Sequence, residues 1–320
     1  MATIKIDVFR GIAPKMSARL LPEGSAKTAV NCRLDSGDLT PIRALADVTS
    51  TSESGGTKNS LYKYDTVGSV VQWLRWNEDV DVVRSPVAGN TANRVYFTGD
   101  SVDSMKPRVT QNTVAIGAGT VYPTTSYRLG LPAPSTAPTA VVVGTAPAAT
   151  DNEVKETRSY VYTFVTANGE EGPPSPPSAV FDLYPTSQTA AVSAIQTSED
   201  ASYNVTHKYI YRTVTSAAGT QYMFVASVLL SAATYADSLT SLQVGGALPS
   251  TGWSAPPDGM IGLTSLSNGI LAGFKDNEVM FCEPFMPHAW PTKYRMSTDF
   301  PIVGIMAVGS SLIVTTKAYP

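Results

Sequence analysis

Two histidines and one glutamate are the first candidates for chemistry in this 320-residue chain. The histidines are His207 and His288, and Glu283 precedes His288 by five positions. An imidazole near a carboxylate could act as an acid and base pair, or both groups could bind a metal ion. Two prolines separate them, which predicts a loop instead of the helical face on which such ligands are usually spaced. We therefore expect Glu283, His288 and Trp290 to cap a sheet edge, with the Trp290 N–H bonded to a backbone acceptor.

Other chemical motifs are weaker still. Residues 77 to 81 (Asn-Glu-Asp-Val-Asp) form an acidic turn, but they lack the glycine and distal glutamate of a calcium loop, so we expect a solvated hairpin tip. Cys32 and Cys282 stand far apart, which predicts two buried apolar residues instead of a disulfide or zinc site. No phosphate loop, dinucleotide fingerprint or nucleophile elbow is present. We predict no catalytic, cofactor or metal site and no enzyme, although glycan-cleaving carboxylates can come from distant strands.

Composition limits the classes of partner. Charged residues are 15% of the chain, against about 25% in typical domains, and this favours a turn-rich β protein with extensive subunit contacts. A plain secreted β-sandwich would have a similar composition. The net charge is −3 and the basic residues are scattered, which argues against nucleic-acid binding but suits a conduit through which DNA slides. No apolar run approaches a membrane span and the start lacks a signal-peptide core, so we predict synthesis in the cytosol without membrane insertion.

The elements that would position these residues are short strands. From 268 to 319, apolar runs rich in β-branched and aromatic residues end at Gly, Asn, Asp or Pro, which predicts successive antiparallel strands with a turn at Lys275-Asp276-Asn277. A second series is expected at 61–64, 70–76, 80–87, 94–98 and 108–109. Trp73 and Trp76 fall on opposite faces of one strand, so one of them should lie in the core. In the first 43 residues we expect a strand from Ile4, a short helix at 25–30 and a hairpin turning at 35–38.

The chain divides at a proline-rich segment, residues 127–138, which should be an extended spacer. Beyond it, Tyr160, Tyr162 and Phe164 share one strand face, and an Asn-Gly turn at 168–172 closes that strand. This pattern resembles fibronectin type III or immunoglobulin-like modules, although four more strands follow where such a module would be ending. We predict an all-β protein with three parts. These are 1–134, a strap and the first part of a propeller-like body; 135–250, an inserted β-sandwich; and 251–320, the second part of the body.

Several stretches carry a family resemblance. They are Phe9-Arg10-Gly11-Ile12-Ala13-Pro14, Leu20-Leu21-Pro22-Glu23-Gly24-Ser25-Ala26, Asn31-Cys32-Arg33-Leu34-Asp35-Ser36-Gly37-Asp38-Leu39-Thr40-Pro41 and the strand series from Asn268 to Tyr319. Together they resemble virion structural proteins of tailed bacteriophages, in the tail nozzle or tail tubular class of short-tailed phages. The resemblance covers the first forty residues, 157–253 and 256–319. None of these stretches is a catalytic motif, so the resemblance implies a family and no chemistry.

What the resemblance implies is a structural role in the virion tail, after synthesis in the host cytoplasm. Copies of the chain would form a ring below the portal and adaptor and let the genome pass during ejection without specific DNA binding. The implied partners are further copies, the portal and adaptor, other tail proteins and the host cell surface. One alternative is that 135–250 binds a host-surface glycan or receptor through its tyrosine-rich edges. Another is an enzyme acting on glycan or peptidoglycan.

The number of repeated units raises a further expectation. A propeller typically has about four to eight blades of four strands, and the sequence shows two blade-like units, near 61–110 and 261–300. The sequence pattern of residues 310–320 also predicts a strand, and no turn pattern follows it before Pro320. Either the remaining blades lie beyond the given sequence or the body is not a closed propeller, and we expect the natural polypeptide to continue past Pro320.

Overall fold

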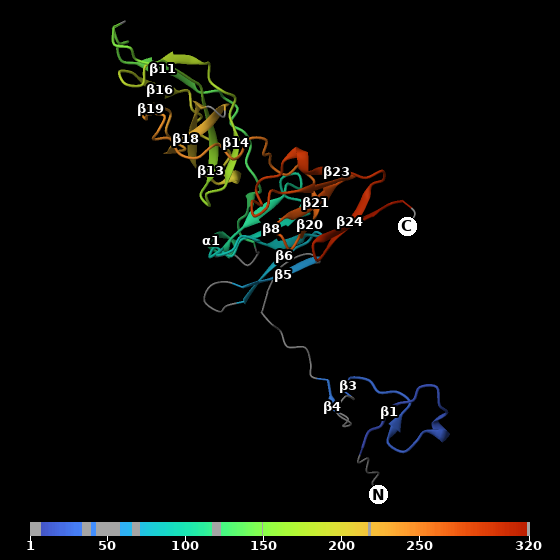
Figure 1. The fold of residues 1–320 in the computed structure, drawn as a ribbon. Helices are drawn as coiled ribbons and strands as arrows, with labels where there is room; N and C mark the ends of the chain where they lie inside the picture. The colour runs from blue at the N-terminus through green and yellow to red at the C-terminus, as the bar shows by residue number, and fades with distance from the viewer. Residues whose placement is uncertain are drawn as a thin grey trace. The chain divides into compact units, whose positions relative to one another are not determined.

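A computed structural model describes residues 8–33, 40–42, 58–65, 71–116, 123–148, 150–216 and 219–318 (Figure 1). Contacts along the chain define two compact units, Met1–Ser52 and Glu53–Pro320. The three-part division expected from the sequence uses different boundaries and stays a prediction. The expected turn at 35–38 and the start of the expected first strand at Ile4 lie outside the described residues.

The first unit is built from very short strands. Strand β1 (Gly11–Ile12) pairs in parallel with β2 (Ser25–Ala26), and β3 (Cys32–Arg33) pairs with β4 (Thr40–Pro41) in antiparallel fashion. A single 3₁₀ turn, η1 (Ala18–Leu20), lies between β1 and β2. The pairing of β3 with β4 confirms the two arms of the expected hairpin.

The prediction of a short helix at 25–30 is wrong. Ser25 and Ala26 are extended, and the carbonyls of Gly24 and Ala26 accept hydrogen bonds from Arg10 and Ala13. Helical propensity predicts local structure only weakly, and pairing with another segment can override it. Here the backbone groups form hydrogen bonds to residues 10–13 instead of within a helix. The α-helix that the described residues do contain, α1 (Asn112–Ala115), is four residues long.

The second unit begins with two antiparallel groups of strands. A two-stranded sheet and a four-stranded meander in the order β10-β9-β8-β7 are both antiparallel. Trp76 is buried and Trp73 only half-buried, which confirms that one of the two tryptophans enters the core. The strands are β5 (Ser60–Asp65), β6 (Val71–Trp76), β7 (Asp81–Arg84), β8 (Val95–Thr98), β9 (Arg108–Thr110) and β10 (Tyr127–Arg128).

The end of the chain forms a second four-stranded meander and a hairpin. The meander runs in the order β20-β21-β22-β23, and the hairpin pairs β24 with β25. Asp276 takes a left-handed conformation in the two-residue turn between β21 and β22, at the turn the sequence predicts. The elements are β20 (Ile261–Ser265), β21 (Leu271–Lys275), β22 (Glu278–Phe281), η3 (Thr292–Tyr294), β23 (Arg295–Ser297), β24 (Ile302–Val308) and β25 (Ser311–Thr316).

The two meanders share one core although more than 100 residues separate them in sequence. One apolar cluster includes Tyr96 and Leu129 from the first and Leu271 and Trp290 from the second. The backbone N–H of Gly262, in β20, also donates to Asp81 Oδ2 at 2.9 Å. We call residues 58–130 and 251–318 together the body, and residues 135–250 the middle region.

The middle region consists of sheets that pack around a second core. One sheet has the order β14-β13-β17-β18 and another the order β11-β16-β19, while β12 pairs with β15. Tyr160, Tyr162 and Phe164 all point into this core, as their shared face predicts. The elements are β11 (Thr139–Val143), β12 (Glu156–Arg158), β13 (Tyr160–Thr166), β14 (Glu171–Pro174), β15 (Phe181–Leu183), β16 (Thr189–Ser193), η2 (Ala201–Tyr203), β17 (Val205–Ser216), β18 (Gly219–Leu229) and β19 (Tyr235–Asp237).

The all-β class expected from the sequence is confirmed. The sheets are almost entirely antiparallel, and within the described ranges none of them closes on itself. Among the described residues no helix is long and apolar enough to span a membrane.

Candidate assembly surface

The structure does not join the two residues that looked most like a chemical pair. Glu283 accepts a hydrogen bond from the Tyr294 hydroxyl at 3.2 Å and lies 3.5 Å from Lys293 Nζ. His288 is buried edge-on to the Trp253 ring, and neither of its ring nitrogens has a hydrogen-bond partner. Burial, with a smaller effect of the Arg94 charge, lowers the pKa of His288 from 6.5 to about 4. His288 is therefore a neutral core residue at physiological pH.

Trp290 behaves partly as predicted. Its ring N–H donates to the Pro287 carbonyl at 2.8 Å, which confirms the expected backbone acceptor. The ring itself is fully buried in the core shared by the two meanders, so it does not cap a sheet edge. The Trp290 ring packs in a core to which the first meander contributes Tyr96 and Leu129, so its burial depends on that meander.

The remaining sequence candidates also have structural roles. His207 Nδ1 lies 2.9 Å from Thr206 Oγ1. Asn77, Asp79 and Asp81 are exposed, as expected of a solvated acidic turn, but Asp81 lies at the start of β7 and also accepts the N–H of Gly262, which ties the meanders together. Partial desolvation raises the pKa of Asp81. Cys282 is buried, with a pKa raised to about 12, whereas Cys32 is only half-buried, contrary to expectation. Within the described residues, no three His, Cys, Asp or Glu side chains form a group that could hold a metal ion.

A cavity of about 500 Å³ lies on the body. Its lining includes two buried arginines, Arg75 and Arg108, with Glu78 and Asp100. Arg108 donates from Nε and Nη2 to Ser126, at 2.7 and 2.8 Å. These lining residues come from strand ends and loops spread over about 70 positions, and no local pattern could have indicated that they meet.

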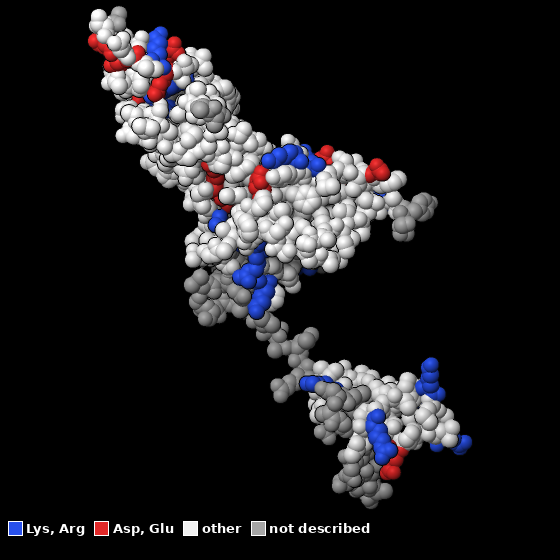
Figure 2. Space-filling view, viewed as in Figure 1, with Lys and Arg blue, Asp and Glu red and all other residues white. Residues whose placement is uncertain are grey.

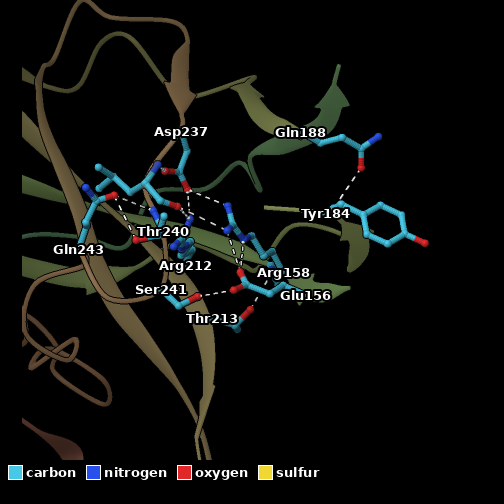
Figure 3. A network of polar contacts seen from close by, with 12 residues as sticks. Glu156, Arg158, Tyr184, Gln188, Arg212, Thr213, Asp237, Thr240, Ser241 and Gln243 are labelled. Atoms are coloured by element: carbon cyan, nitrogen blue, oxygen red, sulfur yellow. Dashed lines mark hydrogen bonds and ion pairs between the residues drawn. The ribbon is translucent and has the colours of Figure 1, made fainter. Parts of the chain in front are cut away.

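A buried ionic cluster lies in the middle region (Figure 3). Asp237 is completely buried and accepts hydrogen bonds from Arg212 Nη1 at 2.7 Å and the Tyr160 hydroxyl at 2.6 Å. Arg158 Nη1 lies 3.6 Å from the same carboxylate, and Arg158 also donates to Glu156 Oε2 at 2.7 Å. Two nitrogens of Arg212, Nε and Nη2, have no hydrogen-bond partner. This cluster links strands β12, β13, β17 and β19.

A second ion pair joins the middle region to the body. Arg94 Nη1, beside β8, lies 3.0 Å from Glu170 Oε1, in the Asn-Gly turn that the sequence predicts after β13. Glu170 is almost fully buried, and desolvation raises its pKa although Arg94 opposes the shift.

The most distinctive surface is one face of the β24–β25 hairpin. Met306 lies opposite Ile313 in the ladder, and their side chains are 59% and 47% exposed. Val303 and Val308, also on β24, are exposed as well. The other face of the hairpin is occupied, because Ile305 and its neighbours pack against the core around Phe274. We call the exposed set, Val303, Met306, Val308 and Ile313, the hairpin face.

The hairpin face also borders an open sheet edge. In the described part of the chain, the ladder bonds of β25 run to β24 alone, and no strand lies on its other side. Residues 302–316 contain no charged side chain, and the body surface visible in Figure 2 is mostly white, with few charged groups. Edge strands are normally protected by charge, proline or cover, so an uncharged apolar edge indicates a contact surface.

Comparison with known proteins adds no assignment. No protein-family model matches the sequence, and no curated protein matches it closely enough to count as a relative.

Proposed function

We propose that this chain is a structural component of a bacteriophage tail, of the nozzle or tail tubular class, and that its copies form a ring through which the genome passes. The observation that carries the proposal is the hairpin face, an apolar surface with an open strand edge that suits contact between copies. The resemblance of the first forty residues and of 256–319 to that class supplies the particular context. Partners in the tail would be the portal, the adaptor and other tail proteins.

The architecture that goes with this proposal is a propeller-like body and an inserted immunoglobulin-like or fibronectin-like module. Two four-stranded antiparallel meanders that share a core are what neighbouring blades would look like. Two sheets packed around Tyr160, Tyr162 and Phe164 support the inserted module.

The proposal is tested by the mass of the native assembly. We expect the purified chain to form a discrete ring in native mass spectrometry, and Met306→Glu with Ile313→Glu to shift it to monomer. A matched control is Leu242→Glu, because Leu242 is 97% exposed in the middle region. A chain that stays monomeric at all concentrations, and is absent from purified phage particles by mass spectrometry, would overturn the proposal.

A second candidate function is binding of a host-surface glycan. The cavity on the body favours it, since about 500 Å³ lies within the usual range of small-ligand sites and its lining offers charged groups, hydroxyls and Trp76. Calorimetric titration with lipopolysaccharide-derived oligosaccharide would test it, with Arg75→Gln as the variant expected to weaken binding. No heat of binding at millimolar oligosaccharide would refute this alternative, and zymography with the intact chain separates it from a glycan-cleaving enzyme.

A further inference from the structure

We propose that the cavity on the body binds an acidic sugar, whose oxyanion meets Arg108 and whose hydroxyl groups meet Glu78 and Asp100. This inference rests on the second candidate function, glycan binding at the same cavity, and it names the chemical class of the glycan. Three features of the described lining carry it: unpaired donors, an excess of positive charge, and two carboxylates that can accept further hydrogen bonds.

The first feature is a pair of buried donors in the described part of the lining. They belong to Trp76 and Arg108, whose side chains are 5% and 7% exposed. Among the described residues, neither the indole N–H of Trp76 nor Nη1 of Arg108 has a hydrogen-bond partner. Asp103 Oδ2 lies 3.8 Å from Arg108 Nη1, which is too far for a hydrogen bond, and Asp103 bonds to Arg128 instead. Both unpaired groups are donors, so a fitting ligand must supply acceptors.

The second feature is charge. The described lining contains three cations and two carboxylates, although the whole chain has a net charge of −3; these residues are Lys58, Arg75, Arg108, Glu78 and Asp100. Desolvation lowers the pKa of Arg108, and the Asp100 carboxylate opposes this shift without cancelling it. A ligand oxyanion would add the missing negative charge, and its hydrogen bonds with a guanidinium would be charge-assisted.

The third feature is the two carboxylates, which make a bare inorganic anion a poor fit. Glu78 Oε1 accepts the Ser101 hydroxyl at 2.6 Å, and Asp100 Oδ1 accepts the Val102 N–H at 3.0 Å. An ionised carboxylate has about four acceptor positions, so both can also accept hydroxyl groups of a ligand. A free phosphate would mainly be repelled by these carboxylates. A sugar acid carries an oxyanion and several hydroxyl groups on one ring, and the volume of about 500 Å³ suits such a small ligand.

The experiment compares glucuronate with glucose in ligand-observed NMR titrations of the 320-residue chain. The two sugars differ at one carbon, which is a carboxylate in the first and a hydroxymethyl group in the second. We expect the dissociation constant of glucuronate to be about tenfold or more below that of glucose, and the difference to shrink at high salt. Inorganic phosphate is the third probe, and binding as tight as that of glucuronate would overturn the assignment of a sugar.

Charge variants test whether the cavity is the place of binding. Arg108→Gln should lower the preference for glucuronate over glucose by about tenfold, whereas Glu78→Gln, which removes a negative charge, should raise it by about twofold or more. Arg295→Gln is the matched control, because Arg295 pairs with Glu278 at 3.7 Å on another part of the body. Each variant is first checked by tryptophan-detected melting, and Glu78→Gln decides the question if Arg108→Gln does not fold. A preference that is unchanged in the folded variants would overturn the inference.

The outcomes separate this inference from the function on which it rests. If glucose and glucuronate bind equally tightly, the acidic class is wrong and glycan binding stands. If neither sugar binds at millimolar concentration, the inference fails, and the absence of heat with the lipopolysaccharide-derived oligosaccharide would remove the glycan-binding function as well.

Discussion

Replacing Asp237 by asparagine should destabilise the middle region strongly. The substitution keeps the shape of the side chain but removes the charge that faces two buried arginines, Arg212 at 2.7 Å and Arg158 at 3.6 Å. Glu156 would remain as the other carboxylate of the cluster, and its side chain is partly exposed and bonded to Arg158 alone of the two arginines. Arg212 would keep a hydrogen bond to the Leu239 carbonyl, which is neutral.

The expected loss of stability arises because the buried Arg212 guanidinium would be left without its counter-charge. Breaking a buried pair by removing one partner costs about 3–5 kcal/mol, whereas exposed pairs contribute about 0–1 kcal/mol. Asp182→Asn is the matched control, because Asp182 lies half-exposed 3.7 Å from Lys155 in the same region. We expect a loss of about 3–5 kcal/mol for Asp237→Asn and less than about 1 kcal/mol for the control.

The assay is hydrogen exchange of the backbone amides of β13 and β17, read by mass spectrometry. It reports this region alone, and tryptophan fluorescence serves as the reference because Trp73, Trp76, Trp253 and Trp290 all lie outside residues 135–250. A loss of protection no larger than that of the control would refute the reasoning. A second check is Asp237→Leu combined with Arg212→Met, which should recover part of the loss because the uncompensated charge is removed as well.

Three further predictions concern the body. Because burial lowers the pKa of His288 from 6.5 to about 4, the unfolded state binds the proton first as pH falls, so stability should drop by about 3 kcal/mol between pH 6.5 and 4, and His288→Leu should flatten this slope in denaturant titrations. Gly262→Ala should cost roughly 2 kcal/mol or more, since φ is +70° and a Cβ would clash with Phe274, whereas Gly309→Ala, at φ +62° with open space, should cost only about 1–2 kcal/mol by thermal melting. Met306→Glu should weaken self-association by about tenfold in sedimentation velocity, without lowering the melting temperature measured at a concentration where the unsubstituted chain is dissociated, and a lower melting temperature there would mean that the side chain stabilises the single folded chain instead of an interface.

Local sequence patterns predicted much of the fold. The strands from 160 to 237, the turns at 168–172 and 275–277, and the burial of one of the two residues Trp73 and Trp76 all follow from side-chain alternation and from residues that favour tight turns. These features depend on neighbours within a few residues, which is why the sequence alone determines them. The helix expected at 25–30 failed because the short segment pairs with Gly11–Ile12 instead.

The tertiary structure decided which charged and polar residues meet. Asp81 bonds to Gly262, and Arg158 and Arg212 gather around Asp237, although these partners are 25 to 181 positions apart. His288 carries no local sign that it would be buried without a hydrogen-bond partner. Such contacts depend on how whole sheets pack, and sequence alternation specifies only which face of a strand a residue occupies, not what lies across from it.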